Sequence, residues 1–322
     1  MNYELYGLRV RSDLPLNAPA SSDGPVDLEV SWGQPLSATP VPPAGRVLAH
    51  AVWGGRQGYT HTETPQGFVL QFHEICELRV ARDCKRMQVH LAPGANPDMA
   101  ALLVSGNALA FLLMLGGECV LHASAVRHGR AVLAFVGGPG MGKSTLAALL
   151  CAAGARLVTD DVLRLSHGPT AFRCYPGTGE IRLRPGAAAL AAGFRAAVET
   201  VDGRIALRPD YAGPTLPRLD AIVIPYPSRT ERTPRVEQLT GYRTLVALLR
   251  HPRVLGLCAP ELLRRQFEVL GRVARSVPVY EARIPWGPPF DPELVDALVA
   301  RLTPGRRPGV SGDAIRAAPV PA

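Results

Sequence analysis

A glycine-rich loop near the middle of the chain is compatible with only a few folds. The stretch Gly137-Gly138-Pro139-Gly140-Met141-Gly142-Lys143-Ser144-Thr145 fits a phosphate-binding loop (P-loop, or Walker A motif), in which four residues separate a glycine from Gly-Lys-Ser. An apolar run over 131–136 precedes the loop, and another over 146–150 follows it. A buried strand that leads into a helix directs backbone N–H groups toward phosphate oxygens. The sequence therefore predicts an α/β domain that binds a nucleotide.

Two residues of this loop have defined roles in phosphate chemistry. Lys143 is expected to reach the β- and γ-phosphates, and the Ser144 hydroxyl is expected to coordinate Mg²⁺. Only Lys85 and Lys143 are lysines among the 35 basic residues, so arginine serves nearly everywhere else. Because an ammonium is compact and a guanidinium is planar, we interpret Lys143 as a position that requires the ammonium itself.

Length and composition indicate a globular chain of two parts. The 322 residues correspond to about two domains, and 47% of them are apolar and 19% charged. The six cysteines form no Cys-x-x-Cys pair, and the first residues do not have the basic and then apolar pattern of a signal peptide. We therefore expect a cytoplasmic protein. The net charge of +8 comes from dispersed basic residues, so no nucleic-acid partner is expected. Residues 99–117 carry no charge, but Ser105-Gly106-Asn107 at their centre favour a buried helix over a membrane span.

Apolar runs and turn residues divide the chain into a β-rich N-terminal region over 1–97, a nucleotide-binding domain over 98–303 and a disordered tail over 304–322. Strands are expected in the N-terminal region at 3–10, 26–32, 68–72 and 87–91. In the second domain, helices are expected at 98–115, 143–153, 186–199, 241–250, 260–275 and 291–302, and strands at 219–224 and 277–283. The apolar stripe of the helix over 260–275 is expected to comprise Leu263, Phe267, Leu270 and Val273.

The residues before the loop predict a β-hairpin that ends beside it. Runs over 119–126 and 131–136 flank a short turn that contains glycine, which is typical of an antiparallel pair. If Val126 lies opposite Ala131, then His122 lies opposite Phe135, where the loop begins. From there His122 could hydrogen-bond a nearby acid and tune its basicity.

An acidic pair, Asp160-Asp161, follows the helix of the loop within one apolar run, which we expect to form a single strand over 156–165. A carboxylate beside the loop can hold Mg²⁺ or accept a proton from a hydroxyl nucleophile, and two carboxylates could divide these duties. GTPases normally recognise the nucleobase with an Asn-Lys-x-Asp motif. Neither lysine here follows an asparagine, so this motif is not present. Transporter and helicase ATPases carry such an acid much further downstream, so these classes are not expected either.

Several short stretches together resemble the HPr serine kinase family, and in particular its short relatives that phosphorylate peptides. The resembling residues are Leu121-His122-Ala123-Ser124-Ala125-Val126, the loop over 137–145, Leu157-Val158-Thr159-Asp160-Asp161 and Glu180-Ile181-Arg182. A weaker similarity, at Tyr6-Gly7-Leu8 and Val277-Pro278-Val279-Tyr280, is to the kinases found with lasso-peptide biosynthesis.

The resemblance implies that 98–303 form a P-loop kinase domain of the HPr kinase type that uses ATP and Mg²⁺. It further implies that Asp160 acts as a base toward a serine hydroxyl, that His122 lies before the loop, and that Asp161 and Glu180 assist metal binding. Bifunctional members have a longer glycine-rich stretch after the Glu-Ile-Arg motif, whereas Leu183-Arg184-Pro185 follows it here, so the reverse reaction, phosphorolysis, is not expected.

The expected function is therefore an ATP-dependent kinase that phosphorylates a serine of a precursor peptide in lasso-peptide tailoring. A kinase for a small hydroxyl metabolite, such as free serine, and a non-catalytic nucleotide-binding accessory protein are the alternatives. Arg182 could hold the triphosphate or a carboxylate of the substrate, or could be a solvated surface cation. A homo-oligomer is compatible with the sequence. The spacing of Cys76, Cys84, His73 and His90 does not suggest a zinc site.

Overall fold

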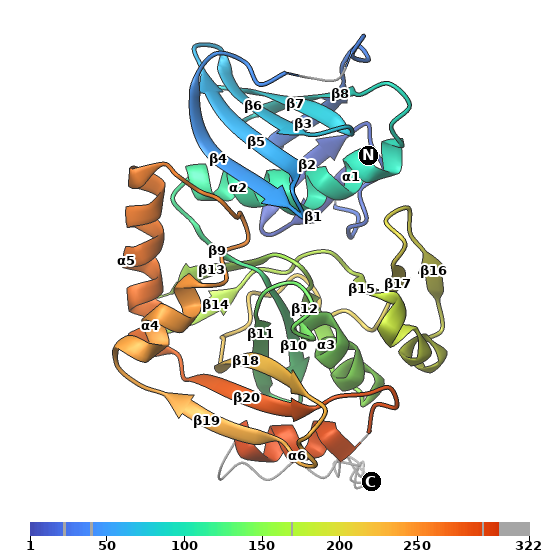
Figure 1. Cartoon of the computed structure of the whole chain (residues 1–322), viewed down its shortest axis with the longest axis vertical. Coiled ribbons are helices and arrows are strands. Elements are labelled where there is room, and N and C mark those ends of the chain that lie inside the picture. Colours follow the sequence, from blue (N-terminus) through green and yellow to red (C-terminus); the bar gives the residue numbers. More distant parts are fainter. Residues whose placement is uncertain (22–23, 39–40, 169, 292, 303–322) are drawn as a thin grey trace, which may run out of the picture.

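The computed structural model arranges the chain as two packed units, with the N-terminal unit above the C-terminal unit in Figure 1. The structure describes residues 1–21, 24–38, 41–168, 170–291 and 293–302. The tail over 304–322, for which disorder is expected, lies outside the described residues.

The N-terminal unit is built on an eight-stranded sheet of order β1-β2-β3-β8-β7-β6-β5-β4. Its strands are β1 (Asn2–Leu5), β2 (Leu8–Ser12), β3 (Leu28–Trp32), β4 (Arg46–Trp53), β5 (Arg56–Thr64), β6 (Gly67–Phe72), β7 (Cys76–Ala81) and β8 (Arg86–Leu91). The single strand expected over 3–10 is wrong. It is instead a hairpin, because Tyr6 and Gly7 adopt positive φ angles of 55° and 75° and reverse the chain.

One long apolar helix packs against this sheet. It consists of α1 (Pro97–Leu103), a π-helical turn (η1, Val104–Ala108) and α2 (Leu109–Leu115). Residues from Ala100 to Met114 join one hydrophobic core with the strands, so the helix packs with the N-terminal sheet although its sequence position follows the expected boundary at residue 97. Within the described residues it is the one helix long and apolar enough to span a membrane, and 72% of its most apolar window is buried in the protein.

The C-terminal unit has a six-stranded central sheet covered on both faces by helices, as Figure 1 shows. In spatial order its strands are β12 (Arg156–Thr159), β10 (Ala123–His128), β11 (Ala131–Val136), β18 (Ala221–Ser228), β20 (Val279–Pro285) and β19 (Arg235–Leu239). Successive side chains of β11 alternate between the two faces. Leu133 and Phe135 pack with α3 (Lys143–Ala152) and α6 (Glu293–Leu302), whereas Val132, Ala134 and Val136 share a core with α4 (Tyr242–Leu249) and α5 (Pro260–Ser276).

The hairpin before the loop forms, but the expected register is wrong by two residues. His128 pairs with Ala131, and Val126 pairs with Leu133. The turn is therefore formed by Gly129, with φ 58°, and Arg130 alone. His122 consequently lies opposite Gly137 rather than Phe135, and its carbonyl accepts a hydrogen bond from the Gly137 N–H at 3.2 Å.

Two strands that the sequence predicts as continuous are interrupted, and their breaks face each other. The run over 119–126 divides at His122 into β9 (Cys119–Leu121) and β10, and the run over 156–165 divides at 160–162 into β12 and β13 (Leu163–His167). Leu121 pairs with Leu163 before the break, and Ala125 pairs with Thr159 after it. The two segments therefore pass side by side from the central sheet into a small sheet of β9, β13 and β14 (Phe172–Cys174).

The helix expected over 186–199 is also wrong. Residues Pro185–Gly193 form a 3₁₀ helix (η2), and Ala197–Glu199 form β16, which pairs with β17 (Ile205–Leu207) next to β15 (Ile181–Leu183). Within η2 only Ala187 is buried, and Leu190 and Ala191 pack on the core while partly exposed, so burial contributes little free energy to hold a long α-helix here.

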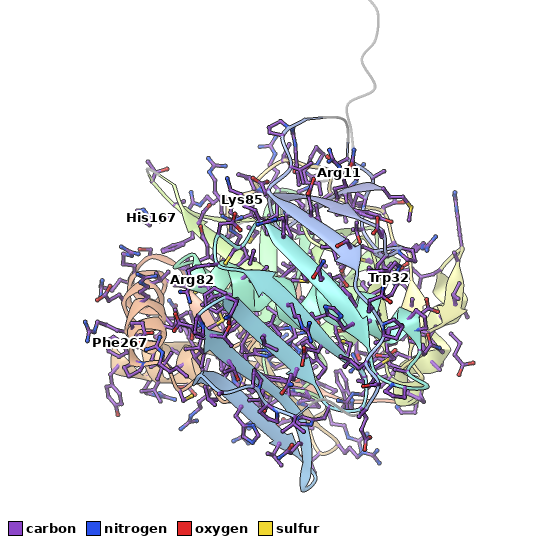
Figure 2. The ribbon with its side chains drawn as sticks, turned by 90° about the horizontal axis from the view of Figure 1, so that it is seen from above. Arg11, Trp32, Arg82, Lys85, His167 and Phe267 are labelled. Atoms are coloured by element: carbon purple, nitrogen blue, oxygen red, sulfur yellow. The ribbon has the colours of Figure 1, made fainter. Side chains whose placement is uncertain are left out.

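Helix α5 occurs where the sequence predicts it, and two of the four residues of the expected stripe, Leu270 and Val273, are buried. Leu262, Gln266, Leu270 and Val273 point into the protein. Leu263 and Phe267, expected in the stripe, are 45% and 53% exposed, and Phe267 lies at the outer edge of the molecule in Figure 2. The expected elements over 219–224, 241–250, 277–283 and 291–302 all occur, with shifted ends.

The burial of the long helix gives a first prediction. Phe111 is fully buried, with its ring 4.7 Å from that of His61. We expect Phe111→Ala to lower the free energy of unfolding by about 3–5 kcal/mol, because it leaves a cavity in the core. The matched control is Phe267→Ala, which should change the free energy by less than about 0.5 kcal/mol. Urea unfolding measures both values, and equal losses would show that α2 is not part of the core.

Candidate active site

The phosphate loop connects β11 to α3, and its backbone needs glycine at two positions. Gly140 and Gly142 have φ angles of 84° and 83°, a conformation that other residues rarely adopt. Gly142 also has no space for a side chain, since a Cβ atom would lie 2.3 Å from the Trp286 ring. Gly142 is the N-cap of α3 and provides no side-chain cap. The first N–H groups of the helix are therefore available to an anion.

Lys143 is a buried cation at the start of α3. It is 6% exposed, and its ammonium Nζ donates a hydrogen bond to the Gly138 carbonyl at 3.0 Å. Burial lowers the pKa of Lys143 to about 8, although Asp160 and Asp161 act in the opposite direction. Lys85, the other lysine, is exposed in the turn between β7 and β8, and Figure 2 labels it on the N-terminal unit.

Asp160 lies within hydrogen-bonding distance of the loop. Its Oδ1 accepts from the Ser144 hydroxyl at 2.9 Å and from the Ser124 hydroxyl at 2.5 Å. Its Oδ2 accepts from the Arg182 backbone N–H at 3.1 Å. Asp160 is 3% exposed, so these three donors fix the orientation of a buried carboxylate.

Asp161 occupies the break between β12 and β13 with a φ of 72°. Its Oδ1 lies 3.3 Å from His122 Nε2, and its Oδ2 accepts from Arg253 Nη2 at 2.6 Å. Burial opposes ionisation of this carboxyl, but the Arg253 guanidinium and His122 hold the pKa of Asp161 well below its usual range. Asp161 is therefore a carboxylate at neutral pH.

His122 is a neutral hydrogen-bond donor at this site. Burial lowers its pKa below the ordinary 6.5, although the bond to Asp161 acts in the opposite direction. Since an ionised carboxylate only accepts hydrogen bonds, His122 must carry its proton on Nε2. The His122 backbone N–H donates to the His251 carbonyl at 3.2 Å, which fixes this strand break against the segment between α4 and α5.

Two arginines complete the surroundings of Asp161. Arg253, between α4 and α5, was not singled out in the sequence, because one arginine among 33 carries no spacing signal. Arg182, on β15, lies with Nη2 3.9 Å from Asp161 Oδ2 and with Nη1 3.0 Å from Asp202. Asp202 also holds Arg204 at 3.2 Å, a role that no sequence motif indicates.

Glu180, which the resemblance implies as a metal ligand, is paired with an arginine. Its Oε1 accepts from Arg208 Nε at 2.9 Å, and the residue is 7% exposed. Glu180 borders a small cavity together with Asp160 and Asp161, but it does not line the larger cavity that contains the loop.

The larger cavity has a volume of about 800 Å³ and lies between the two units. Its charged lining comprises Lys143, Arg182, Arg184, Arg204, Arg229 and Arg253 against Asp160, Asp161 and Asp202, which leaves an excess of three positive charges. Pockets that bind drug-sized ligands span about 300–1,000 Å³, so one cavity here has room for a nucleotide and part of a second substrate. Another cavity of about 620 Å³ is lined by residues of the N-terminal unit, without residues of the loop.

The donors at the loop fit a triphosphate and Mg²⁺. The Gly138 N–H is 3.0 Å from the Met141 sulfur, a weak acceptor that a phosphate oxygen can replace. Ser144 and Asp160 offer hard oxygen ligands side by side. The described residues contain no group of three His, Cys, Asp or Glu side chains that could hold a metal ion. Mg²⁺ bound to nucleotides takes most of its ligands from water and phosphate, so two protein oxygens fit this chemistry.

Gly106, in the π-helical turn, gives the second prediction. A Cβ at this position would lie 3.0 Å from Arg253 Nη2 and 3.2 Å from Asp161 Oδ2. We expect Gly106→Ala to loosen this ion pair and so to raise the pKa of Asp161 toward its ordinary value, as followed by carboxyl ¹³C NMR.

Gly271→Ala in α5 is the matched control for this substitution. Its Cβ would have only an ordinary contact, 3.6 Å from Arg275, so it should leave the pKa of Asp161 unchanged and stabilise the helix by about 0.5–1 kcal/mol. An unchanged titration of Asp161 in Gly106→Ala would show that the glycine is not needed for the pair.

Comparison with known proteins finds similarity among solved structures, and it is distant. No family model matches the chain, and no curated protein matches its sequence. Among solved structures, the chain is similar to the Hpr(Ser) kinase/phosphatase from Coxiella burnetii, with a TM-score of 0.31 and 14% sequence identity. The similarity covers 56% of this chain and 94% of that chain. At this level the relation is one of fold only and distant, so any function must be argued from the geometry of the site.

Proposed function

We propose that this protein is an ATP-dependent kinase that transfers the γ-phosphoryl group to a serine hydroxyl of a peptide, in lasso-peptide tailoring as the sequence resemblance implies. The observation that carries the proposal is the 2.9 Å hydrogen bond from Ser144 to Asp160, with Asp161 next in the chain. It joins the hydroxyl of a phosphate loop to a carboxylate, which is the pair that holds Mg²⁺ in many P-loop enzymes.

This contact favours a division of labour between the two aspartates that is the reverse of the one the resemblance implies. Asp160 touches the loop hydroxyl and would be the metal-side carboxylate together with Ser144. Asp161 points instead toward His122 and Arg253 and lines the cavity. When bound, Mg²⁺ would neutralise charge on the β- and γ-phosphates.

Asp161 would orient the acceptor and take its proton. Phosphoryl transfer passes through a loose transition state that requires little base strength, so a carboxylate of low pKa is adequate. Its Oδ1 accepts from His122, and Arg253 binds Oδ2, which leaves lone pairs for a serine hydroxyl. General-base contributions are typically about 10²- to 10⁴-fold.

The triphosphate would lie along the loop, where Lys143 and the N-terminus of α3 supply positive charge. Arg182, held by Asp202, would approach the γ-phosphate from the side of Asp161. Trp286 packs on Gly142, and the Trp286 and Phe290 rings meet edge to face at 5.2 Å, so this aromatic pair offers a surface for the nucleobase.

The two aspartates give a third prediction. Asp160→Asn should weaken binding of Mg·ATP but not of ATP in EDTA, because it removes the negative charge that would face Mg²⁺. Asp161→Asn should leave both affinities nearly unchanged and lower transfer by about 10²-fold or more. Isothermal titration calorimetry gives the affinities, and transfer is followed with γ-labelled ATP and a degenerate serine peptide mixture. Identical behaviour of the two variants would contradict the division of roles.

Lys143 gives a fourth prediction, on pH. Its pKa is about 8 in the free protein, and bound phosphates would raise it, so nucleotide binding should take up a proton near and above pH 8. The affinity for Mg·ATP is therefore constant below about pH 7 and falls up to tenfold per pH unit above 8. Calorimetry in buffers of different ionisation enthalpy measures the proton directly.

Lys143→Arg provides the control for this titration. A guanidinium stays charged at every pH tested, so the variant should bind without proton uptake and should lose transfer because its planar group does not fit. The same uptake in Lys143→Arg and in the unaltered protein would assign the proton to another group.

A further inference from the structure

The cavity that contains the phosphate loop continues into the N-terminal unit, where its lining changes from charged to apolar. Five aliphatic side chains line this part and are only partly buried: Ile75, Met99, Leu102, Leu103 and Leu255. We refer to them as the apolar chamber. Tyr59 and Phe72, which are almost fully buried, also border it.

One face of α1 supplies most of the chamber. Met99, Leu102 and Leu103 are spaced by three and four residues, which places them on the same side of the helix. The residues of the long helix from Val104 to Met114 are buried, and most of them pack in the core of the N-terminal sheet. The aliphatic face of α1 stays exposed to the cavity, so the protein does not gain the free energy of burying it. An apolar ligand that covers this face would gain that free energy on binding.

The wall behind the chamber is uncharged and held in place. His61 Nε2 bonds Asn107 Oδ1 at 2.8 Å, and the Tyr59 hydroxyl donates to the Leu255 carbonyl at 2.8 Å. The Tyr59 and His61 rings stack at 4.4 Å. Burial lowers the pKa of His61 to about 4, so this histidine adds no charge at neutral pH. The excess positive charge of the cavity therefore belongs to the phosphate end.

The chamber lies on the acceptor side of the reaction centre. The helix that carries Met99 and Leu102 continues into the π-helical turn, where a Cβ on Gly106 would lie 3.0 Å from Arg253 Nη2 and 3.2 Å from Asp161 Oδ2. Leu255 lies two residues beyond Arg253 in the same segment. Both walls of the chamber are thus continuous with residues that hold the proposed base, whereas the aromatic pair of Trp286 and Phe290 comes from the segment after β20.

We propose that the chamber binds an apolar side chain of the acceptor peptide, next to the serine that is phosphorylated. This inference rests on the proposed peptide kinase activity and adds a specificity for leucine, phenylalanine or a similar residue close to the acceptor. Burial of such a side chain is worth about tenfold in affinity or more, because aliphatic groups gain free energy on leaving water.

The test uses a positional peptide library with one fixed serine. Leucine, phenylalanine, glycine, aspartate or lysine is fixed in turn at each of the two positions on either side of the serine. Transfer from γ-labelled ATP and peptide binding in the presence of a non-hydrolysable ATP analogue are measured separately. We expect leucine or phenylalanine to exceed glycine and aspartate by about tenfold in both readouts at one position at least.

Leu102→Gln is the diagnostic variant, and Leu263→Gln, at an exposed position of α5, is its matched control. The first should reduce the apolar preference severalfold with unchanged affinity for Mg·ATP, and the second should keep the preference. Should Leu102→Gln fail to fold, Met99→Gln replaces it on the same helix face.

Three results would overturn the inference: no apolar preference in binding, a preference that Leu102→Gln leaves intact, or a loss of Mg·ATP affinity in Leu102→Gln, which would place the nucleobase in the chamber. Absence of transfer to every peptide, with apolar preference retained in binding, would instead refute the proposed kinase activity. Phosphorylation of free serine as efficient as that of any peptide would refute both.

Discussion

The arrangement of the site depends on two strand breaks that face each other. At His122 and at Asp160–Val162 the two paired segments leave the central sheet together. The positive φ of Asp161 turns its carboxylate away from the hydrogen-bonded strand pair. Asp160 is thereby directed to Ser144 of the loop, while its neighbour meets His122 and Arg253. In an unbroken strand, adjacent side chains would point to opposite faces of the sheet, and two carboxylates could not serve one cavity.

A neighbouring arginine keeps the Asp161 carboxyl ionised against the effect of burial. Isolated buried carboxylates would be protonated, because a low-dielectric surrounding disfavours the charged form. The guanidinium of Arg253 reverses that preference at Asp161. Three neutral hydrogen-bond donors fix the orientation of Asp160. The pairing of Arg182 and Arg204 with Asp202 holds further cations at the rim of the cavity.

Sequence reasoning predicted the parts of the site that are contiguous in the chain. The loop, its flanking strand and helix, and the acidic pair carry local signals, and each forms at its predicted position. The hairpin register was wrong because Gly129 could close either a two-residue or a four-residue turn, and periodicity alone does not choose between them. The interrupted strands were missed since apolar residues flank both sides of each break.

Residues that reach the site through tertiary packing could not be found in the same way. Arg253 and Asp202 belong to segments far from the loop in sequence and look like ordinary surface charges. The assignment of Leu263 and Phe267 to a buried stripe failed because two apolar faces are possible on α5, and only contact with the core selects one. The β-rich nature of the N-terminal region was predictable, but its contribution to the cavity was not.

The π-helical turn sets the rotation of one half of the long helix relative to the other. An α-helix advances by 3.6 residues per turn, so the additional residue of a π turn rotates the second half of the helix by about 100°. With this offset, Met99 and Leu102 before the turn line the cavity, and Phe111 after it packs in the core with the sheet. A continuous α-helix through the same residues would instead rotate every side chain after Val104–Ala108 by about 100°, and Phe111 would leave its position beside His61.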